Sequence, residues 1–316
     1  MAFQRIALLS IGEMGYHWAS LLRSHGVELL GYLRGRSEVT RRRAENAGVK
    51  SVATLSGLVA KADLIVSLVV PSAARRVAVK VARALAQVPR RDLIYLEANA
   101  ISPMTVSAIS RLFGHDQFVD GCIIGSAAKL SRGAVLYVSG PQAERIRELE
   151  RFGFAVRVLG PDIGQASAFK IVYAGFTKGL QGLLVELLLG ARKLGMLGEI
   201  LARYEESFPG LPGKIGQTIA ALPLHAGRRA EEMAELRQTF RHHGLRPLVT
   251  PSVEKILKAI GALKAGKASE TGAREGSLIE TIELLFQAGL LQESEKKSDG
   301  MSGGVTKIES DIRRGG

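Results

Sequence analysis

Three residues near the N-terminus have the spacing of a turn that binds a dinucleotide. They are Ser10, Gly12 and Gly15, in the pattern Ser-x-Gly-x-x-Gly. In the dinucleotide fingerprint the first glycine makes a tight turn, the second lets the backbone approach a pyrophosphate, and the third lets a helix pack on a strand. Ser10 replaces the first glycine, so a plain turn between a strand and a helix is the alternative. The residues that we expect to contact the cofactor here are Ser10, Ile11, Gly12, Glu13 and Met14.

A second group of residues, after the next apolar run, can bind a phosphate. No Asp or Glu lies between Leu29 and Ser37, whereas Arg34 and Arg36 do. An acidic residue at this place binds the ribose 2′-OH of NAD, and arginine accommodates the additional phosphate of NADP. A guanidinium binds phosphate through two parallel hydrogen bonds, and Ser37 can add another from its hydroxyl or backbone N–H. The sequence therefore favours NADP(H) over NAD(H), with a solvated basic helix over residues 34–43 as the alternative.

The composition excludes several other kinds of chemistry. The chain has 316 residues, a net charge of +13 and 46% hydrophobic residues, which predicts a folded protein of about two domains. Cys122 is the only cysteine, so the sequence allows neither an internal disulfide nor a zinc site of several cysteines. The six histidines lack metal-ligand spacing with carboxylates, and we expect no metal.

The basic residues lie mostly in the first half of the chain. Residues 1–160 contain 22 Lys and Arg and 12 Asp and Glu, and the remainder contains 21 and 18. Five arginines and one glutamate lie between Arg34 and Arg43. No aromatic stacking face, repeat or helix-turn-helix pattern accompanies this charge, so we expect no nucleic-acid partner. No signal peptide and no apolar run of about 20 residues is found, which predicts a cytoplasmic protein with no membrane partner.

The first half of the chain alternates between short apolar runs and helical patterns. We expect strands over residues 5–9, 27–33, 64–69, 93–96, 117–119, 134–138 and 155–159, with helices over 16–25, 38–47, 72–87, 103–112 and 141–152. This alternation predicts an α/β fold, a Rossmann-type doubly wound parallel sheet with helices on both faces. Ligands of such sheets lie beyond the carboxyl ends of the strands.

After Pro161 the pattern is helical only. A near-continuous stretch from about 164 to 196 predicts one long helix that joins two domains. We expect an NADP-binding Rossmann domain over residues 1–162 and an all-helical substrate and dimerisation domain over 163–293. The polar, glycine-rich residues 294–316 predict a disordered tail.

Four blocks of sequence follow one another in a characteristic order. They are residues 10–15, 62–71, 120–126 with 133–140, and 164–170. Together they resemble the β-hydroxyacid dehydrogenase superfamily, which includes 3-hydroxyisobutyrate and 6-phosphogluconate dehydrogenases. The resemblance covers about residues 4–195, and residues 222–233 are similar to a less characterised branch with its own C-terminal helical domain. It implies hydride transfer between NADP(H) and a small hydroxy acid, aldehyde or keto compound, in a homodimer.

The resemblance also implies that Lys170 is the catalytic residue. Lys170 lies in the apolar stretch 166–175, where burial lowers the pKa of an ammonium group and lets it donate and accept a proton. A lysine that extends its charge into water from a helix flank is the alternative. Superfamily members commonly have Asn four residues later, where this chain has Ala174. Tyr173 could supply a substrate-binding hydroxyl instead, or lie in the core.

Two further segments are implied to bind substrate. The family's Ser-Gly-Gly loop corresponds to residues 124–126, so Gly125 and Ser126 are expected to contact substrate although the first serine is replaced. His225, at the end of an expected loop with two arginines following it, could face an anionic substrate. Solvated loop charges are the alternative for His225.

Cofactor contacts are implied at two more strand ends. Val70 and Pro71 end an apolar run and are expected beneath the cofactor. Asn99 occupies the position where the family places a polar residue near the nicotinamide. Equally, Asn99 could cap the helix that begins at Pro103.

Other functions remain open from the sequence. Imine reductases share this architecture but usually replace the lysine at the Lys170 position. A non-catalytic NADP-binding protein is the second alternative, suggested by Ala174 and by the serine in the first turn.

Overall fold

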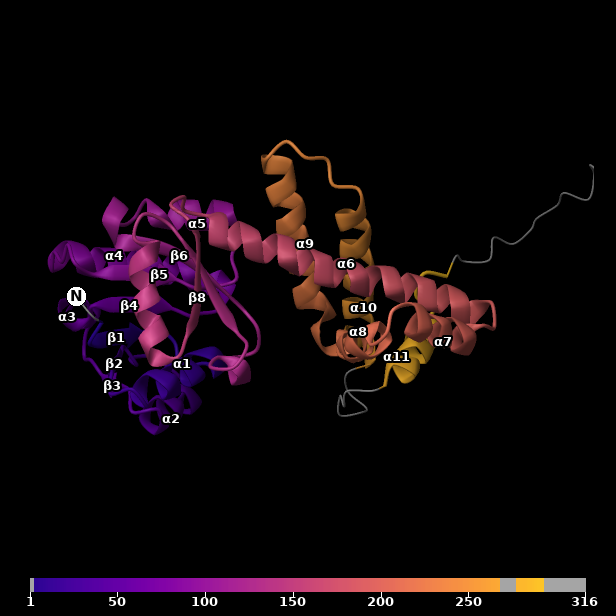
Figure 1. Ribbon diagram of the computed structural model, residues 1–316, viewed down its shortest axis with the longest axis horizontal. Coiled ribbons are helices and arrows are strands. Elements are labelled where there is room, and N and C mark those ends of the chain that lie inside the picture. The colour runs from indigo at the N-terminus through magenta and orange to yellow at the C-terminus, as the bar shows by residue number, and fades with distance from the viewer. Residues whose placement is uncertain (1–2, 268–276, 293–316) are drawn as a thin grey trace, which may run out of the picture. The chain divides into compact units, whose positions relative to one another are not determined.

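A computed structural model describes residues 3–267 and 277–292. The chain divides into two compact units, Met1–Leu183 with His225–Gly261, and Leu184–Leu224 with Ala262–Gly316 (Figure 1). The expected domain limits at residues 162 and 293 stay a prediction. The tail expected over 294–316 lies outside the described residues.

An eight-stranded sheet forms the centre of the first unit. Its order is β3-β2-β1-β4-β5-β6-β7-β8. The strands are β1 (Arg5–Leu8), β2 (Glu28–Gly31), β3 (Lys50–Ser51), β4 (Leu64–Ser67), β5 (Ile94–Glu97), β6 (Phe118–Ile124), β7 (Val135–Ser139) and β8 (Ala155–Gly160). The chain winds outward from β1 to β3 and then returns to β4. The switch point, where ligands bind in such sheets, therefore lies between β1 and β4.

Two strands, β7 and β8, depart from the expected parallel arrangement. β7 pairs antiparallel with β6, and all other pairs are parallel. Residues 125–134, which join these two strands, contain only the short 3-10 helix η3 (Ala127–Lys129). A parallel connection needs a crossover of a dozen or more residues, so this short link can only return the chain in the opposite direction.

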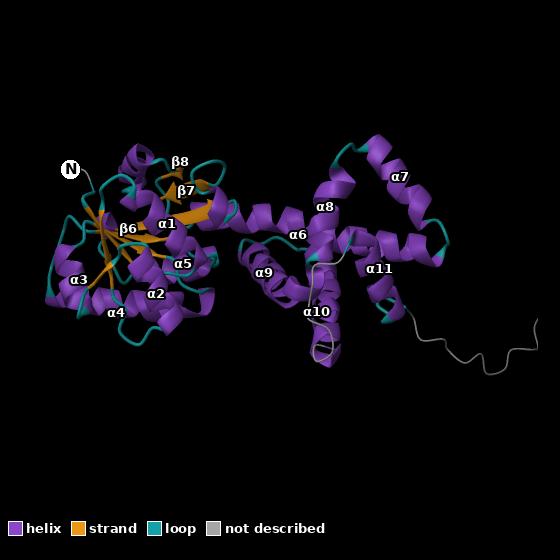
Figure 2. Cartoon of the chain, turned by 90° about the horizontal axis from the view of Figure 1, so that it is seen from below, coloured by secondary structure: helices purple, strands orange, loops and turns teal. Residues whose placement is uncertain are grey.

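Helices cover both faces of the sheet and create two cores (Figure 2). They are α1 (Glu13–Arg23), α2 (Glu38–Asn46), α3 (Leu55–Lys61), α4 (Ala74–Gln87), α5 (Pro103–Ser110), and the 3-10 helices η1 (Pro71–Ala73), η2 (His115–Gln117) and η4 (Ala143–Phe152). Side chains of α1, α2 and η4 enter one core, and those of α3, α4 and α5 enter the other. Along β1, Ile6 and Leu8 face the first core and Ala7 the second, because successive strand residues point to opposite faces.

The rest of the described chain is helical. The helices are α6 (Gln165–Lys193), α7 (Leu197–Ser207), α8 (Leu211–Ala220), α9 (Leu222–His242), α10 (Val249–Lys267) and α11 (Leu278–Gln287). The long helix expected from the sequence is present as α6, whose 29 residues span about 44 Å. The loop expected before His225 is wrong, since α9 already begins at Leu222. Pro223 follows directly, and proline is tolerated in a first helical turn.

Among the described residues, α6 is the one helix long and apolar enough to cross a membrane by length and composition. Its most apolar 18-residue window has a mean hydropathy of 1.2 and is 28% buried. The sequence predicts no apolar run of about 20 residues, whereas α6 meets the criterion by length and composition alone. Core helices of soluble proteins meet the same criterion.

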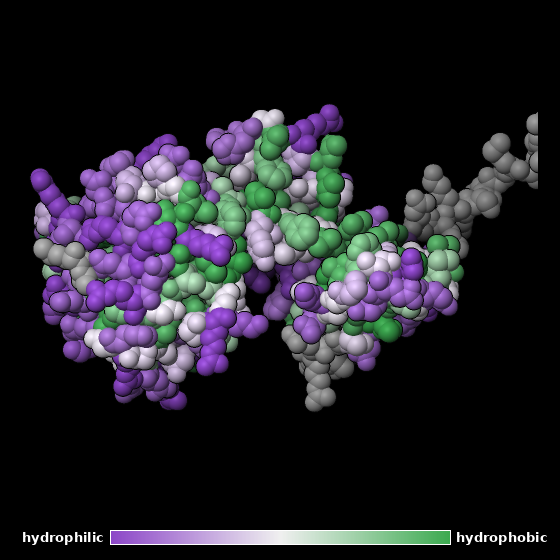
Figure 3. Space-filling view, in the orientation of Figure 1, coloured by the Kyte–Doolittle hydropathy of each residue, from purple (hydrophilic) through white to green (hydrophobic). Residues whose placement is uncertain are grey.

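Large apolar side chains are exposed along one side of α6. This apolar stripe consists of Phe169, Val172, Tyr173, Phe176 and Leu183. The spacing of three, four or seven residues places them on one helix face. Figure 3 shows apolar surface along the part of the molecule where α6 lies.

Candidate functional site

The turn between β1 and α1 is shaped by two glycines with different roles. A Cβ atom on Gly15 would lie 2.1 Å from the carbonyl oxygen of Ser10, so only glycine fits there. A Cβ atom on Gly12 would meet nothing closer than the Ser10 hydroxyl at 4.0 Å. Gly12 is the N-cap of α1, and no side chain caps the first N–H groups of that helix. The turn thus keeps free donors and space for a phosphate group.

One of the two arginines after β2 lies close to this turn. Arg36 donates a hydrogen bond through Nη2 to the carbonyl oxygen of Leu9 at 2.9 Å, which ties it to the end of β1. Arg34 is exposed and lines an open hollow of about 550 Å³. Ser37 caps α2, where its hydroxyl accepts the Thr40 N–H at 3.3 Å. Arg36 therefore lies beside the first turn, and Arg34 and the N-terminus of α2 follow β2 close to it in the sequence.

The two residues expected beneath the cofactor are at the surface. Val70 follows β4 and is 65% exposed, and Pro71 begins η1 and is also exposed. Both lie past the carboxyl end of the strand next to β1. Their place agrees with a cofactor contact, which stays a prediction.

Four buried polar residues form one row across the carboxyl half of the sheet. Ser67 on β4 is paired with Glu97 on β5, Glu97 with Asp120 on β6, and Asp120 with Ser139 on β7. All four are 0% exposed. Sequence reasoning missed this polar row. The sequence signal that could have revealed it is a single polar residue at the end of an apolar strand. Ser67, Glu97 and Ser139 have this position in β4, β5 and β7.

One end of the polar row holds Asn99. The Asn99 side-chain Nδ2 donates to the Ser67 hydroxyl at 2.9 Å and to Glu97 Oε1. Its backbone N–H donates to the same Glu97 oxygen at 3.2 Å. Burial raises the pKa of Glu97 to about 7. Asn99 does not cap α5, because Ser102 does so by accepting the Thr105 N–H.

The other end of the polar row fixes the start of α6. Asp120 Oδ1 accepts the Ser167 hydroxyl at 2.7 Å, and Oδ2 accepts the Ser167 backbone N–H at 2.9 Å. The Ser139 hydroxyl accepts the Ala166 N–H at 3.0 Å. Burial raises the pKa of Asp120, and these hydrogen bonds oppose the shift. A carboxyl group at this helix terminus satisfies N–H groups that have no partner within the helix.

Lys170 lies one turn beyond this attachment. Burial lowers the pKa of its ammonium group. Lys178 and Arg228 lower it further, while Cys122 and Glu232 act in the opposite direction. Within residues 3–267 and 277–292, no carboxylate lies within 4.0 Å of the Lys170 ammonium. Lys170 is therefore a desolvated amine near Cys122 of β6, without a fixed counter-charge.

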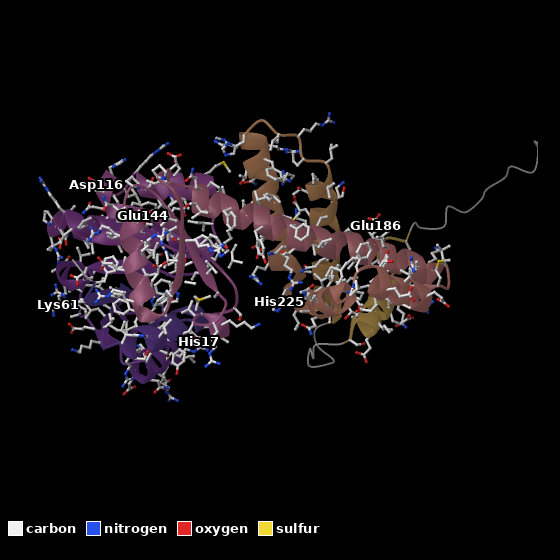
Figure 4. All side chains as sticks on the ribbon, viewed as in Figure 1. His17, Lys61, Asp116, Glu144, Glu186 and His225 are labelled. Carbon is white, nitrogen blue, oxygen red and sulfur yellow. The ribbon has the colours of Figure 1, made fainter. Side chains whose placement is uncertain are left out.

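Contacts between α6 and α9 determine which residues of α9 lie toward Lys170. Arg229 donates to Gln181 at 3.1 Å, and Lys178 pairs with Glu232 at 2.6 Å. These contacts run in opposite directions along the two helices, so α9 is antiparallel to α6. His225, labelled in Figure 4, is exposed at the beginning of α9. Arg228, one turn further along α9, is among the charges that act on Lys170.

The remaining expected substrate residues lie at the surface. Tyr173 is 48% exposed, so the alternative of a core residue is wrong. Gly125 has φ +128°, and a Cβ atom there would lie 2.6 Å from Ala134 Cα, so the position requires glycine. Ser126 is exposed directly after it. This loop begins three residues after Cys122, which interacts with Lys170.

Metal ligands are not grouped in the described parts of the chain. No group of three or more His, Cys, Asp or Glu side chains that could hold a metal ion occurs there.

Comparison with family models gives two matches. Residues 5–152 match the NAD binding domain of 6-phosphogluconate dehydrogenase. Residues 191–260 match a domain of unknown function, DUF1932. An uncharacterised 28.5 kDa protein of Methanothermus fervidus, encoded in the 5′ region of a 7S RNA, is 30% identical over 261 residues. The alignment covers 81% of this chain and 98% of that protein.

Solved structures share the fold. A conserved protein of unknown function, described as structurally similar to 3-hydroxyacid dehydrogenases, has 30% identity and a TM-score of 0.69 over 83% of this chain and 98% of its own. The 3-hydroxyisobutyrate dehydrogenase of Mycobacterium tuberculosis, solved with L-serine, has 16% identity and a TM-score of 0.70 over 90% and 99%. Imine reductases, one solved with NAD+, match with TM-scores of 0.51 to 0.55. The sequence identities of the M. tuberculosis enzyme and of the imine reductases to this chain are low, so these likenesses concern the fold alone.

Proposed function

The chain belongs to the β-hydroxyacid dehydrogenase superfamily, and from this premise we propose an NADP-dependent oxidoreductase. It transfers a hydride between NADP(H) and a small hydroxy acid, aldehyde or keto compound. The observation that carries this proposal is Lys170, whose pKa burial lowers, on a helix whose first turn is bonded to Asp120 of the same sheet that carries the dinucleotide turn. Perturbed amines in such positions serve proton transfer.

The residues present fit a nicotinamide dinucleotide. The free N–H groups at the start of α1, with the open side of Gly12, suit its pyrophosphate. Arg34, Arg36 and the N-terminus of α2 suit a 2′-phosphate. Asn99 retains a buried side-chain oxygen without a donor among the described residues. This acceptor suits a polar group at the nicotinamide end of the dinucleotide. When bound, the cofactor supplies or accepts the hydride.

Lys170 is proposed to handle the proton. As an ammonium it donates to a carbonyl oxygen that is being reduced, and as an amine it removes the proton of an alcohol that is being oxidised. A lowered pKa makes it easier for the ammonium group to give up its proton. The loop of Gly125 and Ser126, with the Tyr173 hydroxyl, is proposed to orient the substrate.

The charge near Lys170 favours an anionic or carbonyl-bearing small molecule as substrate. Lys178 and Arg228 share one carboxylate, that of Glu232, at 2.6 and 3.3 Å. Adding Lys170 leaves an excess of positive charge in this part of the unit. Such an excess attracts carboxylates to the site. His225, exposed at the beginning of α9, is proposed as a further contact of an anionic substrate.

The presence of Lys170 also bears on the alternatives. An imine reductase on this fold would usually lack a lysine here. A non-catalytic NADP-binding protein would have no need for a desolvated amine beside the expected substrate loop. We therefore favour reduction of a carbonyl group or oxidation of an alcohol.

We further propose a cytoplasmic homodimer. The apolar stripe on α6 exposes more large side chains than a solvated helix face usually does, and a second copy of the chain would cover it. Light scattering at micromolar concentration tests this assembly, and a monomer contradicts it.

A substrate screen tests the proposed activity. Purified protein is mixed with NADPH and with aldehydes, keto acids, semialdehydes or cyclic imines, and loss of NADPH absorbance is followed. Turnover of a carbonyl compound supports the proposal. Turnover of cyclic imines alone favours the imine reductase, and binding of NADPH without any turnover favours the non-catalytic protein.

A further inference from the structure

The helices on one face of the sheet carry charge of a single sign. α3, α4 and α5 contain five Lys and Arg and no Asp or Glu, whereas α1, α2 and η4 on the opposite face contain seven Lys and Arg and six Asp and Glu. A sixth cation, Arg111, directly follows α5. We name these six residues, all of them exposed, the cationic face: Lys61, Arg75, Arg76, Lys80, Arg83 and Arg111.

The spacing of the basic residues on α4 gathers them on the solvent side of this helix. Arg76, Lys80 and Arg83 follow one another at intervals of four and three residues, which places them on one helix face. The side that packs on the sheet is apolar and consists of Ala74, Ala78, Val81, Ala84 and Leu85. At 1.5 Å per residue the three cations extend over about 10 Å of the helix axis. α4 therefore presents a row of positive charge to the solvent.

The charge of the cationic face is not neutralised by the described part of the chain. None of its six members forms an ion pair there, and the carboxylates that flank α4 in the sequence, Asp63 and Asp92, are bound by other arginines. On the opposite face of the sheet, by contrast, Arg42 and Arg147 pair with glutamates of their own helices. The cationic face thus keeps its full charge available for an anionic partner.

The residue types of this face select among anionic partners. Four of its six cations are arginines, and a guanidinium binds a phosphate through two parallel hydrogen bonds. α3, α4 and α5 expose no large apolar side chain, although many are exposed elsewhere in the described chain. Insertion into a lipid surface and a stable protein interface both depend on such side chains. A polymer of phosphate groups binds through charge alone.

The absence of aromatic residues on these helices separates duplex from single-stranded nucleic acid. α3, α4 and α5 contain no Phe, Trp or Tyr, and single strands are held largely by bases stacked on aromatic rings. A duplex keeps its bases inside and presents its phosphates to the protein. The sequence predicts no nucleic-acid partner because features that stack on or read bases are missing, but contact with phosphates alone requires neither.

We propose that the cationic face binds the phosphate backbone of a nucleic-acid duplex without reading its sequence. This binding is separate from the proposed oxidoreductase activity. α4 begins beyond the carboxyl end of β4 and runs back to the start of β5, which is parallel to β4. Lys80 and Arg83 therefore lie toward the edge of the sheet opposite to the one where the cofactor is expected.

The fluorescence anisotropy of a short fluorescein-labelled DNA duplex measures this binding. We expect a micromolar dissociation constant at low salt, and a slope of about −4 to −5 for the logarithm of affinity against the logarithm of salt concentration, as four or five phosphate contacts predict. A duplex of permuted sequence should bind within about twofold. Absence of binding at low salt, or a strong preference for one sequence, overturns the proposal.

Two matched double variants locate the contact on the surface. Lys80→Gln with Arg83→Gln removes two charges from the cationic face, and Arg42→Gln with Arg43→Gln removes two exposed charges from the opposite face. The first should weaken duplex binding by at least about 10-fold and make the salt slope shallower by about 2, whereas the second should weaken it by less than about threefold. Equal weakening by both means that only the net charge matters, and it overturns the proposal.

A second variant of the cationic face guards against a change in folding. Arg75→Gln with Arg111→Gln should also weaken duplex binding. Thermal unfolding and NADPH affinity should be unchanged in all variants, so loss of duplex binding and failure of the proposed oxidoreductase activity are independent results. A variant that loses duplex binding only together with its folded structure counts against the proposal if the other one binds normally.

Unlabelled competitors identify the class of partner. The duplex, one of its single strands, vesicles of phosphatidylglycerol and phosphatidylcholine, and poly-L-glutamate are each added to the labelled complex. The duplex should displace the label at the lowest concentration of charged groups. More effective displacement by the single strand, by the vesicles or by poly-L-glutamate overturns the assignment to a duplex.

Discussion

Asp120 accepts the Ser167 hydroxyl at 2.7 Å and the Ser167 backbone N–H at 2.9 Å, three residues before Lys170. A buried carboxyl group of the central sheet is thereby bonded to the first turn of α6. Because a helix is stiff, the first turn sets the position of the next one. The polar row and the candidate catalytic amine are parts of one rigid arrangement.

Removing this attachment should lower activity more than it lowers cofactor binding. Ser167→Ala deletes the hydroxyl bond and leaves the backbone bond to Asp120, so we expect a loss of about 1 kcal/mol in the free energy of unfolding. Misplacement of Lys170 should reduce kcat while the NADPH dissociation constant stays unchanged. Chemical denaturation, steady-state kinetics and fluorescence titration give the three quantities. Ser107→Ala on α5, whose hydroxyl takes no part in this contact, is the control, and an unchanged kcat in Ser167→Ala would argue against a positioning role.

The two glycines of the first turn should respond differently to alanine. Gly15→Ala places a Cβ atom 2.1 Å from the Ser10 carbonyl oxygen, so overpacking should destabilise the protein by about 1–3 kcal/mol. Gly12→Ala meets only the Ser10 hydroxyl at 4.0 Å, so the fold should tolerate it while the pyrophosphate loses space. Thermal unfolding and NADPH titration of both variants check this. If Gly12→Ala is stable and binds NADPH with full affinity, the pyrophosphate does not bind at this turn.

Arg34 and Arg36 should confer the preference for NADPH over NADH. We expect the wild type to bind NADPH more tightly, and Arg34→Ala to lose on the order of 10-fold in NADPH affinity with little change for NADH. Arg36→Ala should affect both cofactors, because it also loses the bond to the Leu9 carbonyl oxygen beside the turn. Fluorescence titrations measure all four affinities. Equal or stronger NADH binding by the wild type contradicts this interpretation of the arginines.

The buried Glu97 should make stability fall as the pH rises. Its pKa is raised from 4.5 to about 7, so between these values the folded state retains a proton that the unfolded state has lost. The stabilisation is complete below pH 4.5 and is lost as the pH rises through 7, by about 3 kcal/mol in total. Asp120, whose pKa is also raised, adds in the same direction. Urea denaturation from pH 5 to 8 measures this slope.

The same series on Glu97→Gln isolates the contribution of this carboxyl group. Glutamine does not titrate, so the slope should flatten and the variant should be the more stable protein at pH 8. Glu144→Gln, at a side chain 73% exposed, should leave the slope as it is. Identical slopes in the wild type and Glu97→Gln would mean that Glu97 titrates normally.

The sequence predicts the sheet well because local signals agree there. Apolar runs, the Gly12–Gly15 turn and the serine caps at Ser37 and Ser102 each act over a few residues. β3 has only two residues and gives no such signal. The direction of β7 depends on the length of its link to β6. Predicting where the strands lie does not by itself predict in which direction each one runs.

The candidate site is predicted less completely, because much of it depends on contacts between distant residues. Lys170 and the arginines stand out by type and spacing. The polar row does not, since Ser67, Glu97 and Asp120 are separate in the sequence and meet only through strand register. Likewise, the contacts of Arg229 and Glu232 with Gln181 and Lys178 follow from the packing of α9 on α6, which local sequence does not specify.

The most direct test of the proposed function compares wild-type protein, Lys170→Ala and the surface control Lys61→Ala with the best substrate from the NADPH screen. Turnover and NADPH affinity are measured on the same samples. Loss of the proton donor and acceptor should reduce turnover of Lys170→Ala by at least about 100-fold, with NADPH affinity nearly unchanged and Lys61→Ala fully active. Normal turnover by Lys170→Ala would contradict the catalytic role of this lysine.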